Sequence, residues 1–249
     1  MIIGVSGRIN SGKDTVGSIV KYWLNWAGKG KAGSYSSYML MDHWYNPMDW
    51  QIKKFADKLK YMTTLLTGAT LEQLEDREFK NSYLPPCWDI EKQMTECDGN
   101  DGVDGYAVMP MTYREFMQKL GTEAIRNGLH SDTWVNALMA DYDSSSNWII
   151  TDLRFPNEYE SIKRKGGICI RVHRSTDIVK EESNEVLTVS FKKDGVPTVS
   201  FKEVSQPFAH SSETALDSYK FDYYLNNTGS IEDLVIDVKE MLVHFKLLD

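Results

Sequence analysis

The sequence predicts an α/β protein whose parallel β-sheet is covered by helices on both faces. Short apolar runs of strand length alternate along the chain with segments of helical periodicity, which is the order typical of a parallel sheet. The first apolar run leads into a glycine-rich segment that fits G-x-x-x-x-G-K, at Gly7-Arg8-Ile9-Asn10-Ser11-Gly12-Lys13. Because this phosphate loop stands between a predicted strand and a predicted helix, the expected fold class is the three-layer P-loop NTPase fold.

The predicted strands are apolar runs bounded by glycine or polar residues. They cover residues 2–6, 148–151, 168–172 and 223–225. A different pattern stands at residues 188–202, where Thr-Val-Ser-Phe-Lys occurs twice around Lys193-Asp194-Gly195. Alternating residues on both sides of an Asp-Gly turn predict a β-hairpin added to the surface of the core.

The predicted helices carry apolar residues at helical spacing, and three of them begin at a capping residue: Thr70, Thr112 or Ser230. They cover residues 13–27, 50–66, 71–79, 112–127, 131–142, 157–165 and 230–246. The expected apolar face of the helix at 112–127 consists of Phe116, Met117, Leu120 and Ala124. Residues 28–48, with one short strand, and residues 80–110 are predicted loops. The Asp-Gly run at residues 98–105 lacks the register of a calcium-binding loop.

Composition excludes several classes of protein. The 249 residues are 41 % hydrophobic and 26 % charged, as expected of a globular protein with a substantial core. A net charge of −8 argues against binding to a nucleic-acid backbone. The three cysteines have no zinc-site spacing and favour a reducing compartment, the cytoplasm. We expect no signal peptide, and without an apolar run of about 18 residues we expect no membrane span.

The phosphate loop predicts a site for a nucleoside triphosphate. Glycines let backbone N–H groups surround phosphate oxygens, the following helix contributes its positive end, and Lys13 adds a full charge. Asp14 follows Lys13 where the common pattern has Ser or Thr, so the ligand of Mg²⁺ stays open among Ser11, Asp14 and Thr15. The predicted ATP-binding residues are Gly7, Arg8, Asn10, Ser11, Gly12, Lys13, Asp14 and Thr15.

A second set of charged residues, Asp152, Arg154 and Glu158, follows the apolar run at 148–151. An Asp at this position suits Mg²⁺ held through water, and an Arg suits a phosphate held by two hydrogen bonds. The alternative is that the Asp caps the next helix and that the Arg is solvated. The position beside a phosphate loop favours the functional interpretation.

Five segments follow one another in order along the chain: residues 6–15, 114–123 (Arg-Glu-Phe-Met-Gln-Lys-Leu-Gly-Thr-Glu), 152–158, 210–216 (His-Ser-Ser-Glu-Thr-Ala-Leu) and 222–234. In these segments the chain resembles the deoxynucleoside monophosphate kinases of tailed bacteriophages. The resemblance covers most of the chain, and the ordered set is much more specific than the phosphate loop alone.

This resemblance implies transfer of the γ-phosphoryl group of ATP, with Mg²⁺ as cofactor, to deoxynucleoside 5′-monophosphates (dNMPs). It also implies one kinase domain over residues 1–249, with an NMP-binding region at about 40–130 and a lid insertion at about 174–212. The expected catalytic residues are Lys13, Asp152, Arg154 and Arg174, and the expected metal-site residues are Thr15 and Asp152. The expected substrate-binding residues are Lys58, Arg114, Gln118, Thr122, Arg126, Trp134, Arg154 and Glu158.

Several of these residues have a plainer alternative. Lys58 suits a solvated helix face, Trp134 suits the core, and Arg171, beside Arg174, suits a strand surface. Two other functions remain open: a different P-loop kinase, such as one resembling dephospho-coenzyme A kinase, and a non-catalytic nucleotide-binding protein. The expected partners are small nucleotides, with neither nucleic acid nor membrane. The sequence leaves the oligomeric state open, with a homodimer as one candidate.

Overall fold

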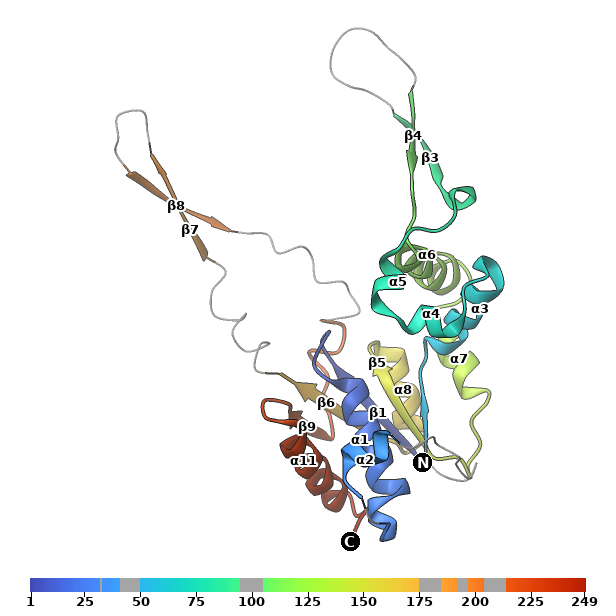
Figure 1. Ribbon diagram of the computed structural model, residues 1–249, viewed down its shortest axis with the longest axis vertical. Helices are drawn as coiled ribbons and strands as arrows, with labels where there is room; N and C mark the ends of the chain where they lie inside the picture. Colours follow the sequence, from blue (N-terminus) through green and yellow to red (C-terminus); the bar gives the residue numbers. More distant parts are fainter. Residues whose placement is uncertain (32, 41–49, 95–104, 175–184, 192–196, 204–213) are drawn as a thin grey trace. The chain divides into compact units, whose positions relative to one another are not determined.

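The computed structural model describes residues 1–31, 33–40, 50–94, 105–174, 185–191, 197–203 and 214–249 (Figure 1). Its contacts divide the chain into two compact units. The first unit combines Met1–Lys54 with Tyr142–Asp249, and the second is Phe55–Asp141. Across the described ranges, no helix is long and apolar enough to cross a membrane.

The first unit is built on a five-stranded sheet in which every strand pairing is parallel. The strands, in spatial order, are β2 (Gln51–Lys53), β5 (Trp148–Leu153), β1 (Ile2–Gly7), β6 (Ile168–His173) and β9 (Tyr223–Asn226). Four of the five were predicted as strands, and the parallel sheet confirms the predicted fold class.

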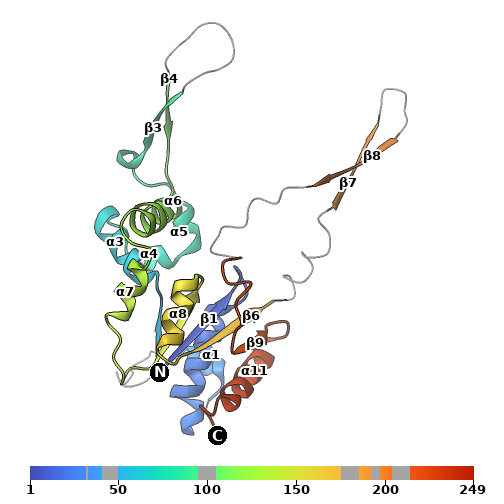
Figure 2. The same cartoon turned by 180° about the vertical axis from the view of Figure 1, so that it is seen from behind.

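Helices cover both faces of this sheet (Figures 1 and 2). Helices α1 (Lys13–Asn25) and α11 (Ile231–His244) pack against each other on one face. Their apolar side chains join those of the strands in one core, in which Val20, Ile170 and Val238 are fully buried. Helix α8 (Pro156–Arg164) covers the opposite face. This arrangement confirms the predicted three layers.

The predicted helix at residues 50–66 is wrong in its first part. Gln51–Lys53 is instead the edge strand β2, which pairs with β5, and the helix α3 (Asp57–Thr67) starts only afterwards. A strand of three residues is too short to show a period of two. The segment before it, predicted as a loop, contains two short helices, η1 (Ala27–Lys29) and α2 (Tyr35–Met39).

The second unit has its own apolar core, made by Ala69, Leu74, Leu84, Met111, Tyr113 and Phe116. The predicted helix at 71–79 is broken at Asp76, whose backbone is extended and whose side chain caps the next helix. The predicted loop at 80–110 contains an antiparallel hairpin, while residues 95–104 lie outside the described residues. After α3, its elements are α4 (Leu71–Glu75), α5 (Arg77–Asn81), η2 (Pro86–Trp88), β3 (Ile90–Met94), β4 (Gly105–Met109), α6 (Tyr113–Gln118), η3 (Lys119–Asn127) and α7 (Thr133–Met139).

The predicted helix at 112–127 changes its winding halfway. Thr112 and Glu115 form the predicted capping box of α6, but η3 is a π-helix. A π-helix has more residues per turn than an α-helix, so four-residue spacing no longer marks a single buried face. Phe116 is buried as expected, whereas Ala124 is exposed and Gly121 is buried in its place. The prediction of Ala124 as a core residue is therefore wrong.

The predicted surface hairpin is confirmed. Strands β7 (Glu185–Phe191) and β8 (Pro197–Glu203) pair antiparallel, with Phe191 opposite Pro197. The hairpin stands in the connection between β6 and β9, outside the five-stranded sheet.

Candidate active site

The residues that follow the strands of the first unit meet at one edge of its sheet. All five strands are parallel, so their C-terminal ends lie on the same side, where ligands of open α/β sheets bind. The phosphate loop follows β1 at this edge. The other strands are followed by Lys54, Arg154, Arg174 and Asn227.

The phosphate loop is closed around the side chain of Lys13. Its ammonium group donates hydrogen bonds of 2.6 Å to the carbonyl oxygens of both Gly7 and Arg8. The hydroxyl group of Ser11 is fully buried and has no hydrogen-bond partner among the described residues. A buried hydroxyl without a partner is costly, so the loop retains hydrogen-bonding capacity that a ligand can use.

Gly12 is required where the loop enters α1. Its φ of 94° belongs to the left-handed region, which favours glycine. A Cβ atom at this position would lie 2.4 Å from Nδ2 of Asn227, and that same amide donates to the carbonyl oxygen of Ser11 at 2.9 Å. The residue after β9 thus packs directly against the phosphate loop.

Asp14 joins the phosphate loop to two neighbouring strands. Its Oδ1 atom accepts a hydrogen bond of 2.8 Å from the hydroxyl of Thr151 on β5 and lies 3.1 Å from the ammonium nitrogen of Lys54 after β2. Burial acts to raise the pKa of Asp14, but Lys54 and the Thr151 hydrogen bond oppose it, and the net pKa is lower than usual. The carboxylate is therefore ionised at neutral pH.

The end of β5 is irregular beside Asp14. Gly4 pairs with Ile150 and Ser6 pairs with Leu153, so β5 has one residue more than β1 in this interval. A Cβ atom at Gly17 of α1 would meet Thr151, and one at Gly4 would meet Leu153 together with Ile162 of α8. Thr151 and Leu153 therefore face opposite sides of the sheet, and the extra residue lies at Asp152. Irregularities of this kind re-aim side chains and are common near active sites.

Glu158 holds the turn that carries Arg154. Its side chain is 3 % exposed, and its Oε2 atom accepts hydrogen bonds from the backbone N–H groups of Arg154 (2.8 Å) and Phe155 (3.0 Å). Its carboxylate stabilises the start of α8 and thereby orients the backbone at Arg154. A role of Glu158 in substrate binding stays a prediction beside this structural role.

Three arginines lie beside the phosphate loop. Arg174, after β6, donates to the carbonyl oxygen of Asn10 at 3.0 Å. Arg171 is 6 % exposed, so its interpretation as a surface strand residue is wrong; it contacts Ser6 and Asp217. Arg8 of the loop lies 3.5 Å from the same Asp217. Thr15, proposed for the metal site, is half-buried in the first turn of α1.

The second unit carries the other candidate substrate residues. Lys58 forms an ion pair of 2.8 Å with Asp141, and Nε of Arg114 donates to Asn81 at 2.8 Å. Gln118 is exposed, whereas Thr122 and Arg126 are half-buried on η3. Trp134 is 5 % exposed and donates from Nε1 to the carbonyl oxygen of Gly121 at 2.9 Å. The indole therefore lies in the core, which was the plainer alternative for Trp134, and its predicted role in substrate binding stays a prediction.

Comparison with known proteins identifies the family. The sequence model described as deoxynucleotide monophosphate kinase matches residues 56–188, which is more than half of the chain. The chain belongs to this family. It is also similar to the deoxynucleoside-5′-monophosphate kinase of Escherichia phage T5, with 24 % identity over 195 residues that cover 66 % of this chain and 72 % of that protein.

Family membership makes the protein a phosphotransferase that acts on deoxynucleotide monophosphates, and a kinase of this type takes the phosphoryl group from ATP to give the diphosphate. The predicted resemblance and the predicted activity are therefore confirmed. The two alternatives, a dephospho-coenzyme A kinase-like enzyme and a non-catalytic nucleotide-binding protein, are not supported.

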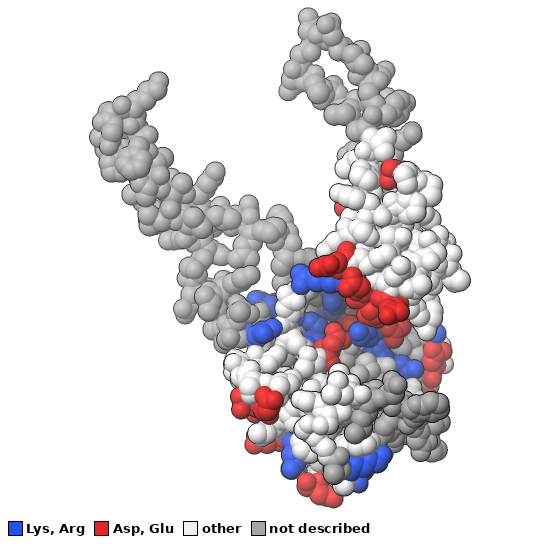
Figure 3. All heavy atoms as spheres, viewed as in Figure 1, with Lys and Arg blue, Asp and Glu red and all other residues white. Residues whose placement is uncertain are grey.

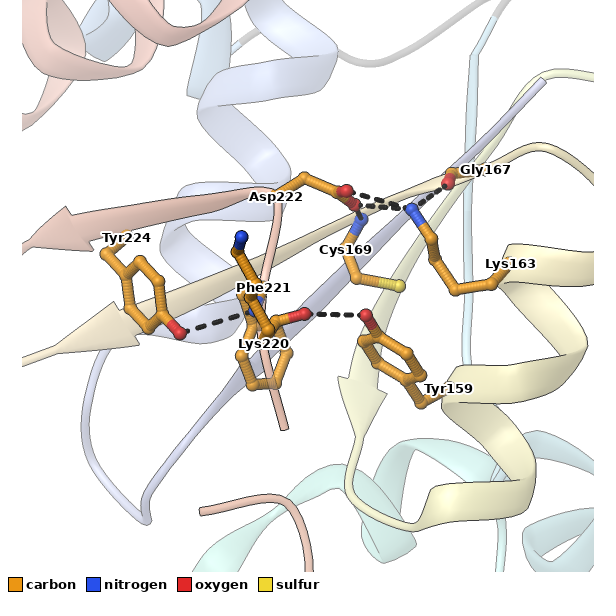
Figure 4. A network of polar contacts seen from close by, with 8 residues as sticks. All are labelled: Tyr159, Lys163, Gly167, Cys169, Lys220, Phe221, Asp222 and Tyr224. Carbon is orange, nitrogen blue, oxygen red and sulfur yellow. Dashed lines mark hydrogen bonds and ion pairs between the residues drawn. The ribbon is translucent and has the colours of Figure 1, made fainter. Parts of the chain in front are cut away.

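A polar network fastens the connection between β6 and β9 in this kinase (Figure 4). Lys163 of α8 lies 2.9 Å from both carboxylate oxygens of Asp222, and Asp222 accepts a hydrogen bond of 2.7 Å from the backbone N–H of Cys169. The hydroxyl of Tyr159 donates to the carbonyl oxygen of Lys220 at 2.6 Å. The thiol of Cys169 is fully buried, and burial raises its pKa to about 12, so it is inert.

Sequence reasoning missed four residues that contact the phosphate loop of this kinase or Asp14 directly after it: Lys54, Thr151, Asn227 and Asp217. Three of them stand at or just after the C-terminal end of a strand, so their position was a usable signal. Asp217 stands in no strand or cap pattern, and the sequence carried no signal for it.

Proposed function

We propose that the phosphate loop binds the triphosphate of ATP and that Lys13 neutralises its β and γ phosphates. The observation that carries this proposal is the convergence of the Lys13 ammonium group and the unpartnered Ser11 hydroxyl on one loop. A triphosphate would replace the carbonyl oxygens of Gly7 and Arg8 as the partner of Lys13. It would also offer Ser11 the hydrogen bond that it lacks.

The reaction needs positioning and charge neutralisation rather than a general base. An oxygen of the dNMP phosphate, already ionised at neutral pH, attacks the γ-phosphorus in line with the departing oxygen. The bond between the γ-phosphorus and the bridging oxygen breaks, ADP leaves, and the dNMP becomes a dNDP. We assign charge neutralisation to Lys13 of the phosphate loop and to Arg154 and Arg174, which follow β5 and β6 at the same edge of the sheet.

The residues at the start of α1 fit Mg²⁺. Within the described ranges, no group of three or more His, Cys, Asp or Glu side chains is placed to hold a metal. Mg²⁺ in kinases needs only one or two protein oxygens, because phosphates and water complete its shell. The ionised Asp14, the hydroxyl of Thr15 and Asp152 provide such oxygens, and Asp152 would act through water. When bound, Mg²⁺ neutralises charge on the phosphate oxygens.

We propose that the second unit recognises the acceptor nucleotide, through Lys58, Arg114, Gln118, Thr122 and Arg126. These residues provide cations and amide or hydroxyl groups on α3, α6 and η3. On the face shown in Figure 3, described Lys and Arg side chains are mixed with Asp and Glu, and the net charge is −8. Both observations suit small nucleotides better than nucleic acid. The deoxynucleotide bases that are accepted are to be found with a panel of the four dNMPs.

We further propose that the chain forms a homodimer and acts in the cytoplasm, which is that of the host cell if a phage encodes it. Light scattering on the purified chain tests the first. Fractionation of infected cells tests the second.

The first test is Lys13→Ala in a coupled assay of ADP release. Removing one charge contact to a transferring phosphoryl group should lower dNMP-dependent turnover by about 100-fold or more. Lys21→Ala, on the same helix α1, is the matched control and should keep the wild-type rate. Full turnover by Lys13→Ala would overturn the proposal.

A further inference from the structure

Asp217 links the phosphate loop to a buried arginine. One carboxylate oxygen pairs with Arg171, and the other lies 3.5 Å from the guanidinium of Arg8 in the loop. Arg171 also donates to the hydroxyl of Ser6 at 3.1 Å, and Ser6 is the last residue before the loop. Both Ser6 and Arg171 are buried. The negative charge of Asp217 thus lies next to a loop that we propose binds the negatively charged phosphates of ATP.

The buried arginine explains why the carboxylate is tolerated there. A buried guanidinium is strongly unfavourable without an opposite charge. Arg171 has that charge in Asp217 and has the ring of Phe221 5.5 Å from its central carbon. The three side chains of Arg8, Arg171 and Asp217 together keep a net charge of +1, so Asp217 does not repel a triphosphate by itself.

The segment that carries Asp217 is fixed by contacts with α8 and β6 a few residues further along the chain. Five residues later, Asp222 is held by Lys163 and by the backbone of Cys169, and between them the carbonyl oxygen of Lys220 is held by Tyr159 (Figure 4). Backbone hydrogen bonds from Asp217 to Thr214 and from Tyr219 to Leu216 close its turns. Asp217 therefore stands on a rigid support, which a side chain needs in order to position another.

We propose that Asp217 is a positioning residue of the donor site, which holds the guanidinium of Arg8 where the phosphates of ATP bind. This inference rests on the proposed function of the loop. The contact with Arg171 is short and its arginine is buried, whereas the contact with Arg8 is 3.5 Å long and both of its side chains are about one-third exposed. Only Nη2 of Arg8 lies near Asp217, so the other nitrogens of the guanidinium can donate to a phosphate oxygen while this contact persists. In the protein without ATP, the contact with Asp217 already restricts the conformations of the Arg8 side chain. Arg8 therefore loses less conformational entropy when ATP binds.

A double-mutant cycle tests this proposal with Asp217→Asn, Arg8→Gln and the double variant. We expect Asp217→Asn to raise KM for ATP about three- to fivefold, the range of a partly exposed ion pair, with KM for dNMP unchanged. In the Arg8→Gln background, Asp217→Asn should have no further effect on KM for ATP. The same increase in both backgrounds, or no increase in either, would overturn the proposal.

Two further variants separate positioning from a general loss of structure. Asp217→Glu keeps the charge and should recover part of the loss in KM for ATP. Asp237→Asn, exposed on α11, removes the same charge elsewhere and should leave all constants unchanged. If Asp217→Asn does not fold, Asp217→Glu in both Arg8 backgrounds completes the same cycle, and equal effects in both would again overturn the proposal.

Failure of this inference differs from failure of the proposed function. Titration calorimetry of the wild type with ATP reports on the loop itself. If the wild type binds ATP, Lys13→Ala does not, and the cycle shows no coupling, only the role of Asp217 is wrong. If the wild type binds no ATP, the proposed function of the loop fails first.

Discussion

At position 14 the chain has a carboxylate where the common phosphate-loop pattern has a hydroxyl. The structure gives this carboxylate two partners, Thr151 on β5 and Lys54 just after β2. Asp14 thus connects the loop to β5 and β2 while also offering a hard oxygen atom beside the phosphates. One residue serves both the rigidity of the loop and the proposed metal site.

Because the pKa of Asp14 is lowered in the folded protein, its contribution to stability should depend on pH. The contribution is complete above the ordinary value of 3.8 and is lost as the pH falls through the lower pKa of the folded state. Asp14→Asn should therefore reduce the free energy of unfolding at pH 7, by at most about 1 kcal/mol because the side chain is exposed. Urea denaturation of both proteins between pH 7 and pH 3 measures the difference. A difference that stays constant with pH would contradict this assignment.

At the residue scale, the sequence was most informative where one segment carries the whole motif. The phosphate loop could be predicted because its glycines, Lys13 and the flanking elements are contiguous. The roles of Arg171 and Glu158 could not, because each depends on a partner that only the fold brings near. The same charged side chain can be a ligand or a structural group, depending on the partners that the fold brings to it.

At the element scale, the π-helix η3 places Gly121 against α3. A Cβ atom at Gly121 would lie 2.8 Å from Cδ2 of Leu59, and the carbonyl oxygen of Gly121 accepts the hydrogen bond of Trp134. The wider turn thus lets three helices meet closely at one glycine. It also carries Thr122 and Arg126, which we propose as acceptor-site residues.

Gly121→Ala should lower stability by about 1–3 kcal/mol, since overpacking of a close helix contact has this cost. Adding Gly121→Ala to the Leu59→Ala variant should cost less stability than adding it to the wild type, because Leu59→Ala has removed the obstructing methyl groups. Gly68→Ala is a useful control, since a Cβ there meets nothing within 4 Å, although its φ of 77° still carries backbone strain. Thermal unfolding of the four variants decides. If Gly121→Ala costs the same stability in the wild type and in the Leu59→Ala variant, the packing argument is wrong.

Elements were predicted well where they are long and periodic, and poorly where they are short. Helices α1, α8 and α11 and the strands β1, β5, β6 and β9 follow the hydrophobic pattern. The strand β2 has three residues and forms only by pairing with β5, far away in the chain, while β3 and β4 lie beside a glycine-rich segment that the sequence marks as a loop. The spacing of apolar residues does not show that the helix becomes a π-helix at Lys119, so the exposure of Ala124 could not be predicted.

At the scale of the whole molecule, the chain consists of two compact units with separate cores. The second unit is continuous in sequence, from Phe55 to Asp141, and its first helix is tied to its last residue by the ion pair of Lys58 with Asp141. The first unit is assembled from both ends of the chain around the sheet. The single kinase domain with insertions stays a prediction from the sequence.

Residues 55–141, expressed alone, should fold. The fragment contains the complete apolar cluster around Leu74 and Phe116 and lies within the usual size range of a domain. Circular dichroism should show helix, and urea should unfold the fragment in one cooperative transition. Leu74→Ala, which removes a fully buried side chain, should abolish or strongly weaken that transition. A fragment with the spectrum of a random coil would contradict its description as a compact unit.

The connection from β6 to β9 has a consequence for how this kinase can vary in length. The chain leaves the sheet at Arg174, which is fastened to Asn10, and it is fastened again at Asp217 and Asp222 before it enters β9. Both ends of the excursion are therefore set by contacts that do not involve the β7–β8 hairpin. Each doubling of the length of such a loop costs only about 0.6 kcal/mol of closure entropy. This interval is accordingly the natural place for sequence to be gained, lost or exchanged among related kinases, and for a foreign domain to be grafted while the sheet and the phosphate loop stay as they are.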